Sequence, residues 1–383
     1  MQKCPYCDFN SHTIKQTIPE EKYIDALLND LEQQLPSIWG RTITSIFIGG
    51  GTPSLMSVRA MDTLLSGIRA RLPFLSDTEV TMEANPGTVE AEKFKGFFDT
   101  GINRISIGVQ SFNNDFLKIL GRIHQADEAK RAFQIAREAG FKNINLDLMY
   151  ALPGQSIDQA LNDLNIATDL KPEHLSWYQL TLEPNTAFHH NPPDKMANDD
   201  RLADISEQGL DYLLNNHYQR YEVSAFNLSG KYPSWHNTNY WQFGDYLGIG
   251  AGAHGKITRA DTQQIIRTSK RRSPKDYLNP EKSFLDNERV IQQQELPLEF
   301  MLNAMRLKNG IHEDLFFQTT GLLLSQIKHA IEKCINKGLI IKKNKNIRPT
   351  ETGFRFLNDI LAEFTDDVFS DLDHVNRITI KEL

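Results

Sequence analysis

The sequence predicts an α/β fold built on a parallel sheet, followed by a smaller α+β domain. From residue 20 to about residue 225, short β-branched runs alternate with amphipathic helical stretches. Such alternation implies a parallel sheet whose faces are covered by helices. Polar residues gather where the predicted strands end, which is the edge at which parallel α/β proteins place their active sites. From Leu296 onward the pattern becomes helical and then contains a short hairpin.

The predicted strands are short runs rich in β-branched and apolar residues. They are Ile43 to Ile48, Glu79 to Met82, Ile102 to Ile107, Ile144 to Met149, Leu175 to Leu182 and Arg220 to Ala225. Between them, apolar residues recur at helical spacing. The helices predicted on this basis include Glu21 to Leu35, Val58 to Leu72, Ala126 to Ala139 and Ile157 to Leu170.

The chain divides into three segments, 1–226, 227–290 and 291–383. Residues 227–255 are rich in aromatics and glycine without a clear period, and residues 256–290 are polar, which predicts a connecting segment. In the third segment a helix over Leu322 to Lys337 precedes a hairpin, Gly338 to Ile341 with Ile347 to Thr350, and a last helix from Gly353. This order is similar to that of a winged-helix module.

Composition narrows the possible functions. Lys and Arg number 42 against 49 Asp and Glu, a net charge of −7 that argues against general nucleic-acid binding. The lysines at the hairpin tip (Lys342, Lys343 and Lys345) are better explained as solvated side chains. No apolar run is long enough for a transmembrane helix, and no segment resembles a signal peptide. Three cysteines, two of them close together, favour a reducing compartment, so we expect a cytoplasmic protein.

Cys4 and Cys7 form a CxxC motif, in which a tight turn can direct both thiols to one metal centre. Alone, such a pair is compatible with half a zinc site, a redox dithiol or part of an iron–sulfur site. The remaining cysteine, Cys334, lies far away in a lysine-rich helical stretch. No second CxxC is therefore present to complete a structural zinc site.

A glycine run, Gly49 to Gly51, follows a predicted strand directly and is continued by Thr52-Pro53. Glycines at such a position let the backbone approach a ligand closely and expose amide groups to it. With the CxxC loop and further segments, the run resembles the oxygen-independent coproporphyrinogen III oxidase family of radical S-adenosylmethionine (SAM) proteins. The further segments are Glu83 to Pro86, Ser106 to Phe112, Leu120 to His124 and Asp147 to Gln155. The resemblance extends from Gln2 to about Gly255, with a weaker match to the family's C-terminal domain.

The resemblance implies a partial (β/α)6 radical SAM barrel over residues 1–226 and a winged-helix-like domain over residues 291–383. It also implies a [4Fe-4S] cluster held by Cys4, Cys7 and a third cysteine, with one iron open to the amino and carboxylate groups of SAM. Carboxylates can accept hydrogen bonds from SAM, and Arg122 can pair with its carboxylate. The residues implied to line the SAM pocket are Gly50, Gly51, Thr52, Glu83, Gln110, Arg122, Asp147 and Thr181.

Two features distinguish branches of this family. Asp8-Phe9 follows Cys7, whereas the oxidases usually carry a further cysteine two residues on. The segment His236 to Trp241 reads HNxxYW, which is the mark of the HemW-type heme chaperones. An imidazole can ligate heme iron, and aromatic rings offer flat apolar surface to the macrocycle. The heme-binding residues implied in this way are His236, Tyr240 and Trp241.

The favoured hypothesis is a heme chaperone that carries heme as cargo, together with the cluster and SAM, and delivers heme to acceptor proteins, respiratory ones being favoured. An electron donor is implied if the cluster is reduced. The alternative is an oxygen-independent coproporphyrinogen III oxidase, whose reduced cluster cleaves SAM to a 5′-deoxyadenosyl radical that starts a propionate decarboxylation. A more general alternative is a radical SAM protein acting on another substrate.

The sequence departs from the family pattern at two places. The pattern CxxxCxxC places its first cysteine one residue before Met1, after a first strand, and Met1 stands where these chaperones commonly carry valine. We therefore expect the native reading frame to begin roughly a dozen residues upstream. At Ala151 the family usually has glycine, and alanine there leads us to expect a negative φ.

Overall fold

The computed structural model describes residues 3–10, 19–87 and 91–365. Within these ranges the first part of the chain forms a seven-stranded sheet of order β1-β2-β3-β4-β5-β7-β6. Its strands are β1 (Ile43–Ile48), β2 (Phe74–Ala84), β3 (Arg104–Gln110), β4 (Ile144–Tyr150), β5 (His174–Gln179), β6 (Tyr218–Glu222) and β7 (Ala225–Leu228). Strands β1 to β5 are parallel, which confirms the predicted parallel sheet.

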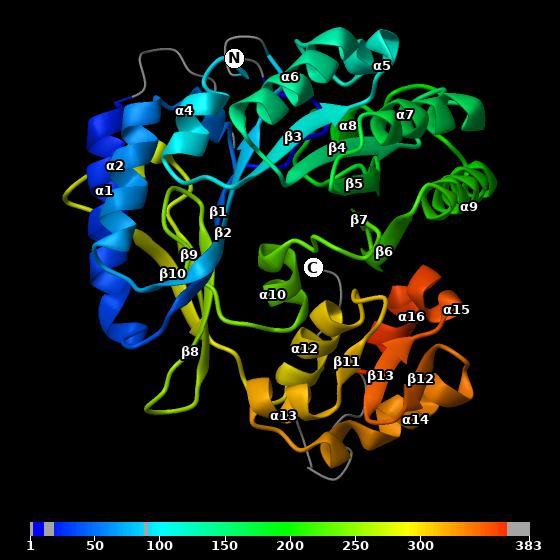
Figure 1. Ribbon diagram of the computed structural model, residues 1–383. Helices are drawn as coiled ribbons and strands as arrows, with labels where there is room; N and C mark the ends of the chain where they lie inside the picture. The colour runs from blue at the N-terminus through cyan, green and yellow to red at the C-terminus, as the bar shows by residue number, and fades with distance from the viewer. Residues whose placement is uncertain (1–2, 11–18, 88–90, 366–383) are drawn as a thin grey trace.

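Helices lie around the outer side of the curled sheet (Figure 1). They are α1 (Glu20–Gln34), α2 (Val58–Arg69), α4 (Phe94–Asp99), α5 (Asn114–Ile119), α6 (Ala126–Ala139), α7 (Ile157–Asp169), α8 (Ala187–His190) and α9 (Asp199–Asn215), with short 3-10 turns η1 (Leu35–Ser37) and η2 (Pro53–Leu55). Helix α6 shows why the boundaries were predictable. A capping box of Gln125 and Glu128 begins it, and Gly140, at φ 108°, ends it. Between them Phe133 and its neighbours bury one apolar face against the sheet.

The last predicted strand, Arg220 to Ala225, is wrong as a single element. A two-residue turn, Val223-Ser224, divides it into β6 and β7, which pair antiparallel. The turn is held by side chains: Arg220 donates to the carbonyl of Val223 at 3.1 Å, and Glu222 accepts from the amide of Ser224 at 3.3 Å. Because the turn contains neither glycine nor proline, the sequence pattern does not mark the reversal.

Residues 227–290 form more structure than the predicted connecting segment. They contain α10 (Trp235–Trp241), β8 (His254–Thr258), β9 (Ile265–Lys270), α11 (Pro274–Tyr277) and β10 (Leu285–Val290). The three strands make an antiparallel sheet of order β10-β9-β8 in the described part of the chain. Most side chains of β10 are exposed and polar, so its sequence lacks the apolar residues by which a strand is usually predicted.

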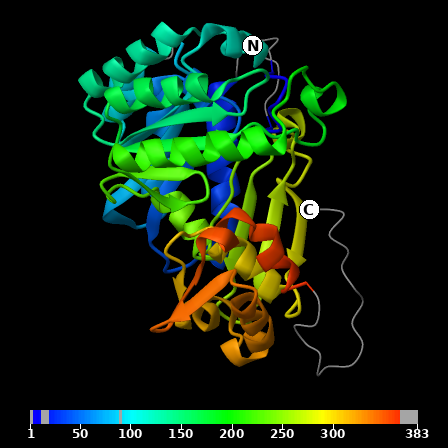
Figure 2. The ribbon, with the colours of Figure 1, turned by 90° about the vertical axis from the view of Figure 1, so that its right-hand side faces the viewer.

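The C-terminal segment forms the predicted winged-helix-like domain. Its elements are α12 (Leu296–Ala304), β11 (Ile311–His312), α13 (Asp314–Thr320), η3 (Leu324–Ile327), α14 (Lys328–Asn336), β12 (Ile340–Lys343), β13 (Asn346–Pro349), α15 (Glu351–Arg355) and α16 (Leu357–Ala362). The hairpin β12–β13 is confirmed, whereas the predicted helix before it begins as the 3-10 turn η3. Figure 2 shows this domain, in orange and red, beneath the sheet. It is joined to the sheet edge by the amide of Lys308, which donates to Tyr221, and by an antiparallel bridge between Glu222 and Leu307.

Three further expectations concern Ala151, the segment before β1 and membrane-spanning helices. Ala151 has φ 59°, so the expected negative φ is wrong: the turn from β4 toward Pro153 imposes a left-handed residue despite its cost for alanine. In residues 3–10 and 19–42 no strand precedes β1, and Met1 lies outside the described residues. None of the described helices has both the length and the apolar composition needed to cross a bilayer.

Candidate radical SAM site

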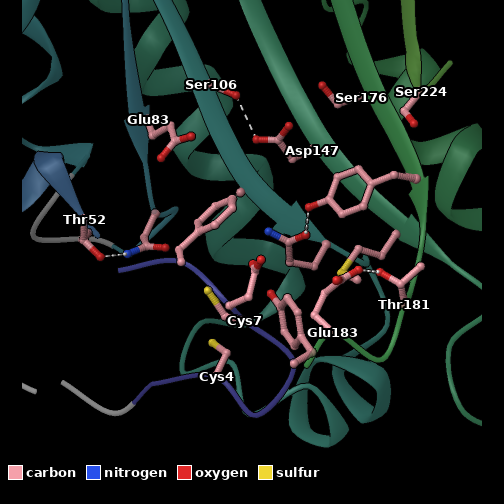
Figure 3. Close-up of a pocket in the computed structure, with 18 of the residues that line it drawn as sticks. Cys4, Cys7, Thr52, Glu83, Ser106, Asp147, Ser176, Thr181, Glu183 and Ser224 are labelled. Carbon is pink, nitrogen blue, oxygen red and sulfur yellow. Dashed lines mark hydrogen bonds between the residues drawn. The ribbon is translucent and has the colours of Figure 1, made fainter. Parts of the chain in front are cut away.

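A cavity of about 540 Å³ lies where the parallel strands end. Figure 3 shows the cysteine loop on one side of it and the ends of β2 to β5 on the other. Most of the predicted site residues line it, namely Cys4, Cys7, Gly51, Thr52, Glu83, Gln110, Arg122, Asp147, Thr181 and Trp241. Gly50 donates its amide to Glu83 just behind this wall, while His236 and Tyr240 lie outside the lining. The topology therefore brings together residues that are far apart in sequence.

The two cysteines lie on one tight turn, in which the amide of Cys7 donates to the carbonyl of Cys4 at 3.2 Å. Both thiols are partly buried and face the cavity, and burial raises the pKa of Cys7. Nη1 of Arg122 lies 3.7 Å from the Cys4 sulfur. No cluster of three or more metal-ligating side chains occurs within the described residues. Two convergent soft ligands fit part of an iron–sulfur site.

Two carboxyl groups face the cavity from β2 and β4, the strands on either side of β3. Burial and the nearby Asp147 raise the pKa of Glu83 to about 7. Burial also raises the pKa of Asp147, although Ser106 donates to it at 2.8 Å and Asn145 at 2.9 Å. Desolvated acids of this kind are stabilised by a ligand that supplies positive charge or hydrogen-bond donors. SAM carries a sulfonium, an ammonium and ribose hydroxyls, so the two carboxyl groups fit it as hydrogen-bond acceptors.

Polar contacts fix the remaining predicted SAM residues. Arg122 donates to Asn85 at 2.8 Å and to the carbonyl of Gly108 at 3.0 Å, so part of its donor capacity is already used. Gln110 has φ 71° at the end of β3 and accepts from the hydroxyl of Tyr178 at 2.9 Å. Thr181 donates to Glu183 at 2.7 Å.

Sequence reasoning missed several residues that line the cavity: Tyr6, Tyr178, Glu222, Ser224, Asn237 and Arg306. For Tyr178 a signal was available, because it lies within the predicted strand Leu175 to Leu182, three residues before Thr181. For Arg306 there was none, since its position depends on how the C-terminal domain packs.

The HNxxYW segment is helix α10, and its two faces differ. Ser234 caps it by accepting from the amide of Asn237. Asn237 and Trp241, four residues apart, face the cavity. His236 and Tyr240 occupy the adjacent face, where the imidazole stacks on Phe47 of β1 with ring centroids 4.3 Å apart. Burial, together with Arg104, lowers the pKa of His236 to about 4, so the imidazole is neutral at pH 7.

Comparison with known proteins agrees with this architecture. Residues 1–167 match the Radical SAM superfamily, and residues 291–356 match the HemN C-terminal domain. The solved structure of coproporphyrinogen III oxidase (HemN) from Escherichia coli superposes with a TM-score of 0.79, at 21% identity, over 95% of this chain and 87% of that one. The fold is thus that of a radical SAM partial barrel with a HemN-type C-terminal domain, as the sequence predicted.

Full-length relatives define the branch. The heme chaperone HemW of Escherichia coli K12 is 49% identical over 364 residues, which cover 95% of each chain. HemW of Haemophilus influenzae is 49% identical over 368 residues, again 95% of each. HemW of Bacillus subtilis is 33% identical over 379 residues, 95% of this chain and 96% of the relative. The chain belongs to the HemW heme chaperone family, which confirms the resemblance drawn from HNxxYW.

Proposed function

We propose that this protein acts in the cytoplasm, where it binds heme, a [4Fe-4S] cluster and SAM and delivers the heme to acceptor proteins, respiratory proteins among them. The observation that carries the proposal is that Trp241 of the HNxxYW helix lines the same cavity as Cys4 and Cys7. A flat apolar ring suits a porphyrin face, and the thiols suit iron.

Six of the predicted residues have a defined task in this proposal. Cys4 and Cys7 hold two irons of the cluster. Glu83 and Asp147 accept hydrogen bonds from SAM, and Arg122 orients its carboxylate. His236 is the candidate axial ligand of heme. Its neutral state suits ligation, which requires an unprotonated ring nitrogen. When bound and reduced, a cluster of this kind supplies an electron to SAM, and an electron donor would have to provide it.

The second candidate function is coproporphyrinogen III oxidation, which shares the fold. Asp8 and Phe9 line the cavity next to Cys7, where the oxidases usually carry a further cysteine, and this favours the chaperone.

The test is a ferric heme titration, followed by its Soret band, beside an anaerobic coproporphyrinogen assay on cluster-loaded protein. We expect saturable heme binding, transfer of the heme to a heme-free b-type cytochrome, and no consumption of coproporphyrinogen. Trp241→Leu should weaken heme binding, whereas Trp39→Leu should not, because Trp39 is 87% exposed and outside the cavity lining. Coproporphyrinogen turnover without heme binding would overturn the proposal.

A further inference from the structure

The C-terminal domain contributes one charged side chain to the cavity, Arg306. This residue lies just beyond α12, and the backbone that follows it is fixed to the end of β6. Lys308 donates its amide to the carbonyl of Tyr221 at 3.0 Å, and Leu307 bridges to Glu222. The backbone that follows Arg306 is therefore held by sheet-like pairing between the two domains.

The guanidinium lies on Trp241, with its central carbon 4.4 Å from the ring centroid. Stacking of this kind orients the guanidinium plane while its N–H groups remain available at the edge. The Nε atom of Arg306 is buried, and so is Nε1 of Trp241. Neither finds a hydrogen-bond partner in the described ranges. Leaving a buried donor without an acceptor is unfavourable, so the site favours an anionic acceptor.

Glu222 does not fill this role. It attracts Arg306 electrostatically, but no ion pair within 4.0 Å joins the two among the residues that the structure describes. Its carboxylate accepts instead from the amide of Ser224 at 3.3 Å, and burial raises its pKa. Arg220, the other arginine at this turn, is occupied, because it donates to the carbonyl of Val223. Among the described residues at this end of the cavity, Arg306 thus has a donor, Nε, without a hydrogen-bond partner.

We propose that Arg306 and Trp241 form a carboxylate-binding subsite for a tetrapyrrole, in which Trp241 packs against the macrocycle and Arg306 pairs with a propionate. The inference rests on the proposed heme binding and adds the group that orients the cargo. A guanidinium fork matches a carboxylate in two parallel hydrogen bonds, and the stacked indole keeps that fork in one plane. The subsite also makes heme binding depend on the docking of the C-terminal domain.

The test compares ferric protoporphyrin IX with its dimethyl ester, in which both propionates are neutral. Arg306→Gln should weaken binding of the free acid by about tenfold or more, the loss expected for one charged hydrogen-bonding pair. The same variant should bind the ester as the unaltered protein does, and its affinity for SAM should not change. Arg306→Lys should recover part of the loss, and Arg355→Gln, an exposed arginine of the same domain, should have no effect.

Thermal unfolding of each variant controls for loss of structure. Equal weakening of the acid and the ester by Arg306→Gln would overturn the propionate assignment, and a matching loss of SAM affinity would assign the subsite to the SAM carboxylate instead. If the unaltered protein bound neither porphyrin, the proposed function and the subsite would both fail. Heme binding that is indifferent to Arg306→Gln would remove the subsite alone.

Discussion

The imidazole of His236 lies nearly parallel to the phenyl ring of Phe47, with the ring planes 18° apart. Tyr240 contacts the same imidazole edge-on at 4.4 Å, so the histidine is enclosed by two aromatic rings. The stack ties helix α10 to strand β1, the edge strand of the large sheet. The residue that the family resemblance implies as a heme ligand therefore also packs two elements together.

His236→Ala should shift or abolish the Soret band of added heme, since an axial bond is lost that ring stacking does not replace. It should also lower the free energy of unfolding by about 2 kcal/mol, because an aromatic pair and buried volume disappear. Heme titration and urea denaturation measure the two effects. Phe47→Leu is the matched control: it removes the stack but keeps the imidazole, so stability should fall while the Soret position is retained. Identical heme spectra for both variants would reject His236 as the ligand.

Glu83 should make stability depend on pH. Its pKa is about 7 in the folded protein and about 4.5 in the unfolded chain, so the folded state retains a proton that the unfolded state has lost. This contribution to stability is complete below pH 4.5 and is lost as the pH rises through 7.

Relative to Glu83→Gln, the unaltered protein should lose about 3 kcal/mol between pH 4.5 and pH 8. Urea denaturation of SAM-free protein across this range measures the difference. Parallel pH profiles for the two proteins would contradict the assignment, and Glu281→Gln, an exposed site, provides the baseline.

Arg122→Ala should weaken SAM binding by about 1.5 to 3 kcal/mol, because the variant loses a charged partner of the SAM carboxylate. The measurement is calorimetry with SAM on cluster-loaded protein. Arg122→Lys should recover little, since a lysine ammonium cannot reproduce the contacts to Asn85 and Gly108 while reaching the ligand. If both variants bind SAM with unaltered affinity, Arg122 serves only to position Asn85 and the cysteine loop.

Asp30→Asn should be strongly destabilising. Asp30 is fully buried on α1, and its carboxylate lies 2.5 Å from the ammonium of Lys270 on β9 and 2.8 Å from the hydroxyl of Tyr277. Removing one charge leaves the other buried without a partner, which costs about 3–5 kcal/mol. Urea denaturation of Asp99→Asn is the comparison, because Asp99 forms an exposed pair with Lys95 whose loss should cost less than about 0.5 kcal/mol. Equal effects of the two substitutions would show that the Asp30 pair is not desolvated as the structure indicates.

Much of the fold could be predicted from local signals. The strand Ile43–Ile48 and the helix Ala126–Ala139 have the bounds expected from the sequence, because β-branched runs and end caps act within a few residues. The β6–β7 hairpin and the β8–β10 sheet were not predicted. The first reverses at a turn without glycine, and in the second the consecutive residues 286–289 of β10 are all exposed, so neither carries a distinct pattern.

The candidate site also contains residues that local patterns predict and residues that they do not. Glu83 and Asp147 could be predicted together because parallel strands end at one edge of a sheet. The directions of the α10 side chains could not be predicted, since HNxxYW does not reveal that Trp241 faces the cavity while His236 faces Phe47. Arg306 depends on contact between two domains, which no local pattern encodes.

The bridge between Glu222 and Leu307 has a consequence for how the chain is made. Strand β6 is the last strand of the sheet order β5-β7-β6, and Leu307 and Lys308 pair with its C-terminal residues, Glu222 and Tyr221. An uncovered strand edge is a template for pairing with a neighbouring chain. On the ribosome the barrel strands emerge before the residues that shield this edge, so the nascent barrel is prone to self-association until α12 and the segment after it have been synthesised.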